Sequence, residues 1–190
     1  MSILQVYSLP NLMYYQHDFV LHRKCREIKL EEIHTPWFQS LVSDMFETLY
    51  ADPSGVGLAA PQIGLSLRLV VIDIKRDAKK PLVLVNPTYE AIGSDTVEST
   101  ETCLSVPLRS GKVIRHKSVI VRAQDYYGTP IEIKGEKFLS NVLQHEIDHL
   151  DGILYIDRMG SLDELITHNG YANSMAKRAI ESTSKKEVNH

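Results

Sequence analysis

Two histidines and a glutamate in the last third of the chain have the spacing of a metal-dependent hydrolase. Residues 144–152 read QHEIDHLDG and contain His-Glu-x-x-His, with His145 and His149 four positions apart. On a helix, this spacing places both imidazoles on one face, where they can bind one divalent metal. Glu146 lies between them and can act as a general base toward a water molecule on that metal. The motif therefore predicts a hydrolytic metal site.

The third metal ligand decides which class of hydrolase the motif belongs to. A thermolysin-like protease would use a glutamate downstream of the helix, for which Glu164 is a candidate. A metzincin would have another histidine shortly after Gly152, but the following residues, ILYIDRMG, contain none. Cys103 is the remaining candidate, although an isolated cysteine is more often a small buried hydrophobic residue. These residues alone leave the choice open.

The composition is that of an ordinary globular chain. Its 190 residues suit one domain, and 43% of them are hydrophobic, enough for a real core. A net charge of -3 favours neither DNA nor a membrane surface as a partner. The first residues lack the pattern of a signal peptide, and no apolar run approaches the roughly 20 residues of a membrane helix. With two cysteines, Cys25 and Cys103, we expect a cytoplasmic chain with free thiols.

The elements predicted around the motif form an α+β fold. Apolar residues recur with helical spacing over residues 37–50, preceded by Thr35 as a candidate cap and by Pro36 in the first turn. A second helix, which carries the metal motif, is predicted over residues 135–151, and Gly152 can end it. Strands are predicted at residues 67–74 and 81–86, within 91–105, and as a hairpin at 119–125 and 131–133. We expect antiparallel or mixed sheets packed around the central metal-bearing helix.

The two ends of the domain carry weaker patterns. Residues 162–180 have a weak helical pattern, and residues 182–190 form a polar tail. We therefore expect a catalytic domain over residues 1–160, with residues 161–190 as a C-terminal helix and tail of the same domain.

Three segments, in a fixed order, resemble the three signature motifs of the peptide deformylases. GVGLAAPQIG at residues 55–64 is similar to the first motif, and ETCLS at 101–105 to the second, which is usually EGCLS. QHEIDHLDG at 144–152 matches the third. The resemblance covers roughly residues 20–159, and three ordered motifs are far more specific than any single one.

The resemblance implies a metal site made by Cys103, His145 and His149. The family generally works best with Fe2+, and Zn2+, Ni2+ or Co2+ also suit one thiolate with two imidazoles. The resemblance further implies that Glu101 and Arg115 form an ion pair that supports the metal-binding loop. The implied fold is that of the peptide deformylases.

The reaction that the resemblance implies is removal of the formyl group from the N-terminal methionine of newly made proteins, with release of formate. Glu146 would take a proton from the attacking water and pass it to the leaving amine. The side-chain amide of Gln62 and the backbone N–H of Leu104 would donate to the oxygen that gains negative charge.

The implied substrate is an N-formyl-methionyl peptide or nascent chain in extended form. Its backbone would pair with residues around Val56 and Gly57 in the manner of an added strand. Val56, Val142 and the ring of His145 would line a pocket for the methionine side chain. The ribosome is a further expected partner, because residues 162–186 include four basic residues: Lys177, Arg178, Lys185 and Lys186.

Thr102 stands where the second motif usually has glycine. A β-branched residue resists a positive φ, and its side chain would narrow the cleft beside Cys103. This departure leaves a second hypothesis, a related hydrolase that acts on another N-formyl substrate, either a small molecule or a carrier-bound intermediate. A third hypothesis is a non-catalytic metal-binding module on the same fold. Glu146 and Gln62 argue against it, because a binding module needs neither a general base nor an oxyanion donor.

Overall fold

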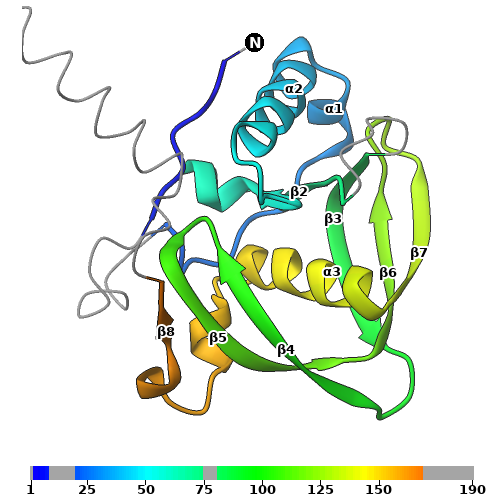
Figure 1. The fold of residues 1–190 in the computed structure, drawn as a ribbon. Helices are drawn as coiled ribbons and strands as arrows, with labels where there is room; N and C mark the ends of the chain where they lie inside the picture. Colours follow the sequence, from blue (N-terminus) through cyan, green and yellow to red (C-terminus); the bar gives the residue numbers. More distant parts are fainter. Residues whose placement is uncertain (1, 9–19, 75–80, 169–190) are drawn as a thin grey trace, which may run out of the picture.

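The computed structural model describes residues 2–8, 20–74 and 81–168, in which two antiparallel sheets surround one long helix (Figure 1). One sheet has five strands in the order β1-β2-β3-β6-β7, and the other has three in the order β4-β5-β8. The helices are α1 (Leu30–Ile33), α2 (Pro36–Ala51) and α3 (Lys137–Leu150), with short 3-10 turns η2 (Ala60–Ile63), η3 (Tyr155–Arg158) and η4 (Leu162–Glu164). The strands are β1 (Gly57–Ala59), β2 (Leu69–Ile72), β3 (Leu82–Ala91), β4 (Thr96–Cys103), β5 (Val106–His116), β6 (Ser118–Gln124), β7 (Pro130–Glu136) and β8 (Ile166–Thr167). The predicted α+β class is confirmed.

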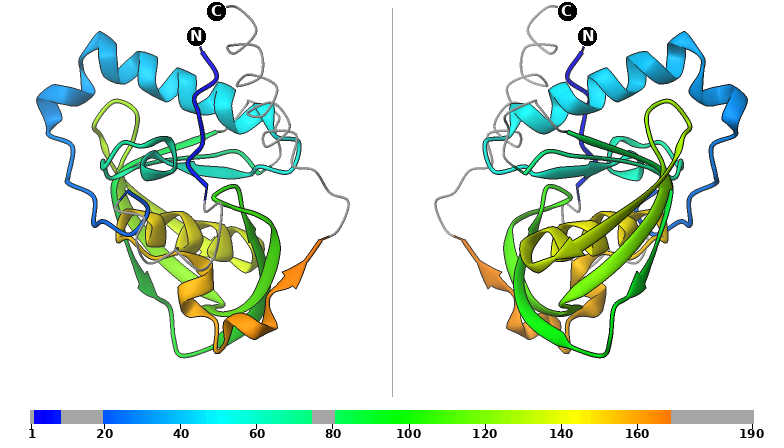
Figure 2. Two further views of the ribbon diagram at one scale, coloured as in Figure 1. Left: turned by 90° about the vertical axis from the view of Figure 1, so that its left-hand side faces the viewer. Right: turned by 90° about the vertical axis from the view of Figure 1, so that its right-hand side faces the viewer.

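The five-stranded sheet lies between α2 and α3 (Figure 2). Strand β2 shows why, because all four of its residues are buried apolar side chains. Leu69 and Val71 pack into the core beneath α2, whereas Val70 and Ile72 pack against α3. Alternate residues of a strand point to opposite faces, so this apolar run supplies both cores at once.

Both long helices begin and end close to their predicted bounds. The side-chain oxygen of Thr35 accepts a 3.2 Å hydrogen bond from the N–H of Phe38 at the start of α2. At the end of α3, Gly152 has a φ of 73°. A Cβ at Gly152 would lie 2.7 Å from the backbone carbon of His22, so glycine is needed there for space as well as conformation. No helix of the described residues is long and apolar enough to cross a membrane.

Strand β5 was not predicted, although at 11 residues it is the longest of the described strands. Its interior positions include Ser110, Gly111 and Arg115 among the apolar ones, so the usual alternation of apolar and polar residues is hidden. A Cβ at Gly111 would overlap the side chain of Met159, so a larger residue there would require that side chain to move. The strand pairs with β4 along almost its whole length and forms one wall of the site.

Two other predicted segments differ in the structure. Residues 55–64, expected to be a shaped loop, include the short strand β1 and the turn η2. The helix predicted at 162–180 is wrong in its described part, where residues 162–164 form a 3-10 turn and Ile166–Thr167 pairs with β5 as β8. The rest of that prediction lies outside the described residues. Pairing with the free edge of β5 outweighs the weak local helical pattern.

Candidate metal centre

Cys103, His145 and His149 bring one sulfur and two imidazole nitrogens together, with all three ligand atoms within 4.8 Å of one another. The Sγ of Cys103 lies 3.3 Å from Nε2 of His149. His145 shares a 2.8 Å hydrogen bond between its Nδ1 and Oε2 of Glu101, which leaves Nε2 for a metal. Burial lowers the pKa of His149 well below its usual range, so this imidazole is neutral and able to act as a ligand. The donor set and its spacing fit one divalent ion.

Strand β4 and helix α3 place these residues opposite one another because alternate residues of the strand and every fourth residue of the helix are spaced at similar distances. Residues two apart on a strand are separated by about 6.6 Å along its axis, and residues four apart on a helix by about 6 Å. Side chains at these intervals can therefore meet pair after pair. Three such pairs link the two elements: Cys103 with His149, Glu101 with His145, and Ser99 with Asn141.

Arg115 supports the metal ligands from behind. Its Nε and Nη2 donate to the two carboxylate oxygens of Glu101 at 2.7 and 2.8 Å, and its Nη1 donates to Asp148. Arg158 donates to Asp148 from the other side. Burial alone would raise the pKa of Glu101, but the hydrogen bonds from Arg115 and His145 outweigh it and lower the pKa to about 2. The expected Glu101–Arg115 pair is confirmed, and it holds the imidazole of His145 through an ionised carboxylate.

Glu146 is enclosed beside the metal ligands. Its residue is 5% exposed, and within the described part of the chain its Oε2 has no hydrogen-bond partner. Burial raises the pKa of Glu146 to about 7. A Cβ at Gly57 would lie 2.5 Å from Oε1 of Glu146, so any larger residue at this point of β1 would displace the Glu146 side chain. A carboxyl group with such a pKa can accept and return a proton near neutral pH.

Gln62 directs its amide nitrogen toward the metal ligands. Its Oε1 accepts a 2.9 Å hydrogen bond from the N–H of Ala59, so the carbonyl end is already occupied. Its Nε2 donates to Oγ of Ser105 at 3.2 Å and lies 3.5 Å from Sγ of Cys103. Leu104 lines the same cleft. The amide nitrogen of Gln62 thus lies beside the sulfur ligand, where it can donate to an oxygen that gains negative charge.

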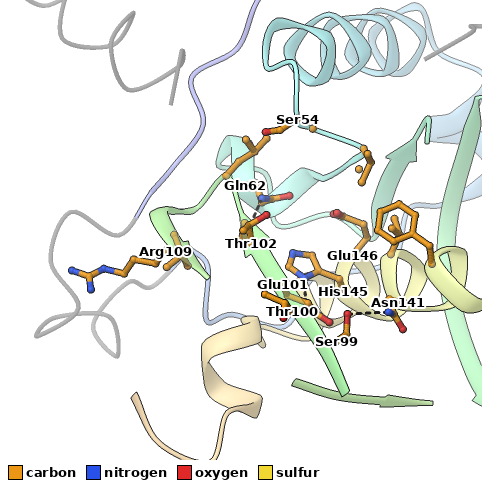
Figure 3. Close-up of a pocket in the computed structure, with 18 of the residues that line it drawn as sticks. Ser54, Gln62, Ser99, Thr100, Glu101, Thr102, Arg109, Asn141, His145 and Glu146 are labelled. Atoms are coloured by element: carbon orange, nitrogen blue, oxygen red, sulfur yellow. Dashed lines mark hydrogen bonds and ion pairs between the residues drawn. The ribbon is translucent and has the colours of Figure 1, made fainter. Parts of the chain in front are cut away.

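The site lies in a cleft of about 450 Å³ (Figure 3). Strands β1 and β4 each form an end of their sheet, and residues of both line the cleft. The cleft thus offers strand edges to which an extended chain could pair. The structure places in its lining all the expected substrate-binding residues: Val56, Gly57, Thr102, Val142 and the ring of His145.

Thr102 does not strain the backbone. It lies in β4, and among the described residues the only non-glycine positions with positive φ are Asn86, Leu108 and Lys137. A β-branched residue would resist a positive φ, but the backbone here is extended, which suits threonine. Its exposed side chain does line the cleft beside Cys103.

Several residues of the site were not predicted. On α3, Phe138 and Asn141 line the cleft at positions seven and four before His145, so helical spacing from the motif could have identified them. Ser99 of β4 pairs with Asn141 at 2.9 Å, and the ring of Tyr155 stacks on His145 with centroids 6.2 Å apart. These last two contacts depend on tertiary structure and leave no local signal.

Comparisons with known proteins agree with this geometry. A family model described as polypeptide deformylase matches residues 10–164. A peptide deformylase of Lachnoclostridium phytofermentans is 42% identical over 154 residues, covering 80% of this chain and 91% of that protein. Peptide deformylase 2 of Vibrio parahaemolyticus is 40% identical over 164 residues, covering 86% and 90%. The crystal structure of a peptide deformylase from Legionella pneumophila superimposes with a TM-score of 0.75 at 37% identity, covering 100% of this chain and 99% of that one.

Proposed function

The chain belongs to the peptide deformylase family, and from this premise we propose a role for each residue of its site. It is a hydrolase that removes the N-formyl group from the N-terminal methionine of newly made chains, and it uses one divalent metal ion. The observation that carries the assignment of residues is that Cys103, His145, Glu146 and Gln62 line one cleft, with His149 directly behind Cys103.

Cys103, His145 and His149 hold the metal. One thiolate and two imidazoles suit several transition metals, and Fe2+ is the ion that we assign to the working enzyme, with Zn2+, Ni2+ or Co2+ able to replace it in purified protein. The ion supplies Lewis acidity, which makes water a nucleophile near neutral pH. The carboxylate of Glu101 keeps the ring of His145 in the orientation needed for binding.

Glu146 carries the proton through the reaction. It accepts a proton from the attacking water and donates it to the amine as the bond to the formyl carbon breaks. The formyl oxygen gains negative charge as the carbon becomes tetrahedral. Nε2 of Gln62 and the N–H of Leu104 donate to that oxygen, and the anchored Oε1 of Gln62 supports this because it fixes which end of the amide faces the cleft.

The substrate binds as an extended strand between the edges of β1 and β4. Its backbone pairs with residues around Val56 and Gly57, and its methionine side chain enters the part of the cleft lined by Val142 and the ring of His145. Thr102 narrows this cleft beside Cys103. If this is its role, Thr102→Gly changes kcat/KM for formyl-methionyl peptides; an unchanged value would exclude it.

The decisive experiment measures metal content and formate release from formyl-Met-Ala-Ser with anaerobically purified protein. We expect activity with Fe2+ and its loss in Glu146→Ala, with the metal retained. Glu98→Ala is the matched control, because Glu98 is an exposed residue of β4 that pairs with Lys112 outside the cleft. Bound metal without formate release in the unaltered protein would instead favour a binding module, and release only from other formylated compounds would favour a different substrate.

The nascent chain as substrate supports two further proposals, that the enzyme works in the cytoplasm and close to the ribosome. The basic residues after residue 168 would provide the ribosome contact. Because β8 pairs with β5 and His168 lines the cleft, a test by truncation should begin after His168. Equal binding of full-length and truncated protein to purified ribosomes would exclude this contact.

A further inference from the structure

We propose that Ser99 and Asn141 are specificity-determining residues that allow the side-chain pocket to accept N-formyl-methionine sulfoxide as well as N-formyl-methionine. The inference rests on the proposed function, in which the first side chain of the substrate enters this pocket. It concerns the third pair linking β4 to α3, the one that takes no part in holding the metal.

The pair lies in the wall of the pocket. Phe138, Asn141, Val142 and His145 occupy one face of α3 and all line the cleft. Asn141 is one helical turn before His145, next to Val142, and Ser99 faces it from β4 (Figure 3). An otherwise apolar pocket wall of valine, phenylalanine and an imidazole face thus contains one amide and one hydroxyl.

The amide and hydroxyl retain unused hydrogen-bonding capacity. Nδ2 of Asn141 donates one of its two hydrogens to Oγ of Ser99 at 2.9 Å. Its second hydrogen and the hydroxyl hydrogen of Ser99 have no acceptor among the described residues. Both residues are partly exposed and line the cleft, so these two hydrogens can be donated to an acceptor on a ligand.

The unused donors favour an oxidised methionine over an apolar side chain of the same length. The thioether sulfur of methionine is a weak acceptor, whereas the sulfoxide oxygen is a strong one. Oxidation adds one oxygen and makes the side chain polar, which an entirely apolar pocket would exclude. Here the added oxygen can accept from Nδ2 of Asn141 and from the hydroxyl of Ser99. Newly made chains whose first residue has been oxidised would therefore still lose their formyl group.

The test compares kcat/KM for formyl-Met-Ala-Ser, both epimers of its sulfoxide, and formyl-norleucyl-Ala-Ser. Norleucine has the length of methionine but no acceptor, so it separates shape from hydrogen bonding. We expect at least one sulfoxide epimer to be used within roughly tenfold of methionine, and Asn141→Leu to lower the ratio of sulfoxide to methionine by roughly tenfold or more. Ser99→Ala should lower the same ratio by less, because Asn141 keeps its donors.

Phe138→Leu is the matched control, since Phe138 lines the same pocket without a polar group. It should leave the ratio of sulfoxide to methionine close to that of the unaltered enzyme. A ratio that is the same in Asn141→Leu and in the unaltered enzyme would overturn the inference, and so would equal losses for sulfoxide and norleucine. Absence of all activity on formyl-Met-Ala-Ser would instead contradict the proposed function, so the two failures are distinguishable.

Discussion

Two arginine–glutamate pairs in this protein have the same bidentate geometry, but one pair is buried and the other is exposed. Arg115 donates to both carboxylate oxygens of Glu101 at 2.7 and 2.8 Å, and Arg26 to both oxygens of Glu32 at 2.9 and 2.8 Å. The side chains of the first pair are 1% and 7% exposed, and those of the second 56% and 26%. The first pair supports the metal ligands, whereas the second joins the start of α1 to the chain before it.

The comparison separates the ionisation of a carboxyl group from its contribution to the free energy of unfolding. The pKa of both glutamates is lowered, that of the buried Glu101 to about 2. For Glu32 the chief cause is the hydrogen bond from Arg26; for Glu101 burial acts first in the opposite direction, and Arg115 and His145 overcome it. Both carboxylates are ionised at neutral pH, but water and salt screen only the exposed pair. A lowered pKa in both glutamates therefore accompanies very different consequences of losing the partner, because solvent screening reduces the free energy carried by the shift in the exposed pair.

The largest effect should follow from removing the arginine of the buried pair. Arg115→Met leaves the carboxylates of Glu101 and Asp148 buried with fewer partners, and such losses cost about 3–5 kcal/mol of unfolding free energy. The orientation of His145 loosens as well, so metal affinity should fall by roughly 10- to 100-fold. Urea unfolding and competition with a chelator measure the two quantities. A loss of stability below about 1 kcal/mol would mean that the buried pair behaves like a surface pair.

An intermediate effect should appear in the pH dependence of stability. Because the folded pKa of Glu101 lies below its ordinary value of 4.5, its contribution is present above pH 4.5 and is lost as the pH falls toward about 2. The contribution of Glu101 amounts to about 3 kcal/mol. Urea unfolding of the metal-free protein from pH 5 to 2 measures it without interference from metal release.

Two variants compare the pairs in that experiment. Glu101→Gln should flatten the decline of unfolding free energy between pH 4.5 and 2, whereas Glu32→Gln should change the slope only slightly, because its pair is exposed. If both variants flattened the decline equally, burial would not determine how much each pair contributes to the free energy of unfolding.

The smallest effect should follow from removing the exposed arginine. Arg26→Met should lower the unfolding free energy by less than about 1 kcal/mol, and the difference should shrink further in 1 M salt. Formate release should not change, because Arg26 lies outside the cleft. A loss of unfolding free energy as large as that of Arg115→Met, or one that persists in high salt, would contradict the expected difference between the buried and the exposed pair.

Sequence patterns predicted the parts of the fold whose determinants are local. The α2 helix, its Thr35 cap and the stop at Gly152 follow from spacing and residue type over a few positions. Strand β5 escaped prediction because Ser110 and Arg115 occupy interior positions, where their partners come from distant segments. The predicted C-terminal helix was wrong over its described part for a related reason, since the edge of β5 provides a stronger partner for Ile166.

The sequence by itself determined the chemistry: two histidines and a glutamate at helical spacing, a cysteine in a family motif, and the glutamine that accompanies them. Each of these follows from residue type and order along the chain. Only the tertiary structure decided which further side chains meet across elements, because such contacts depend on how distant segments pack, as β4 does against α3. The contact of Arg115 with Asp148, the close approach of Gly57 to Glu146 and the Ser99–Asn141 pair are contacts of this kind.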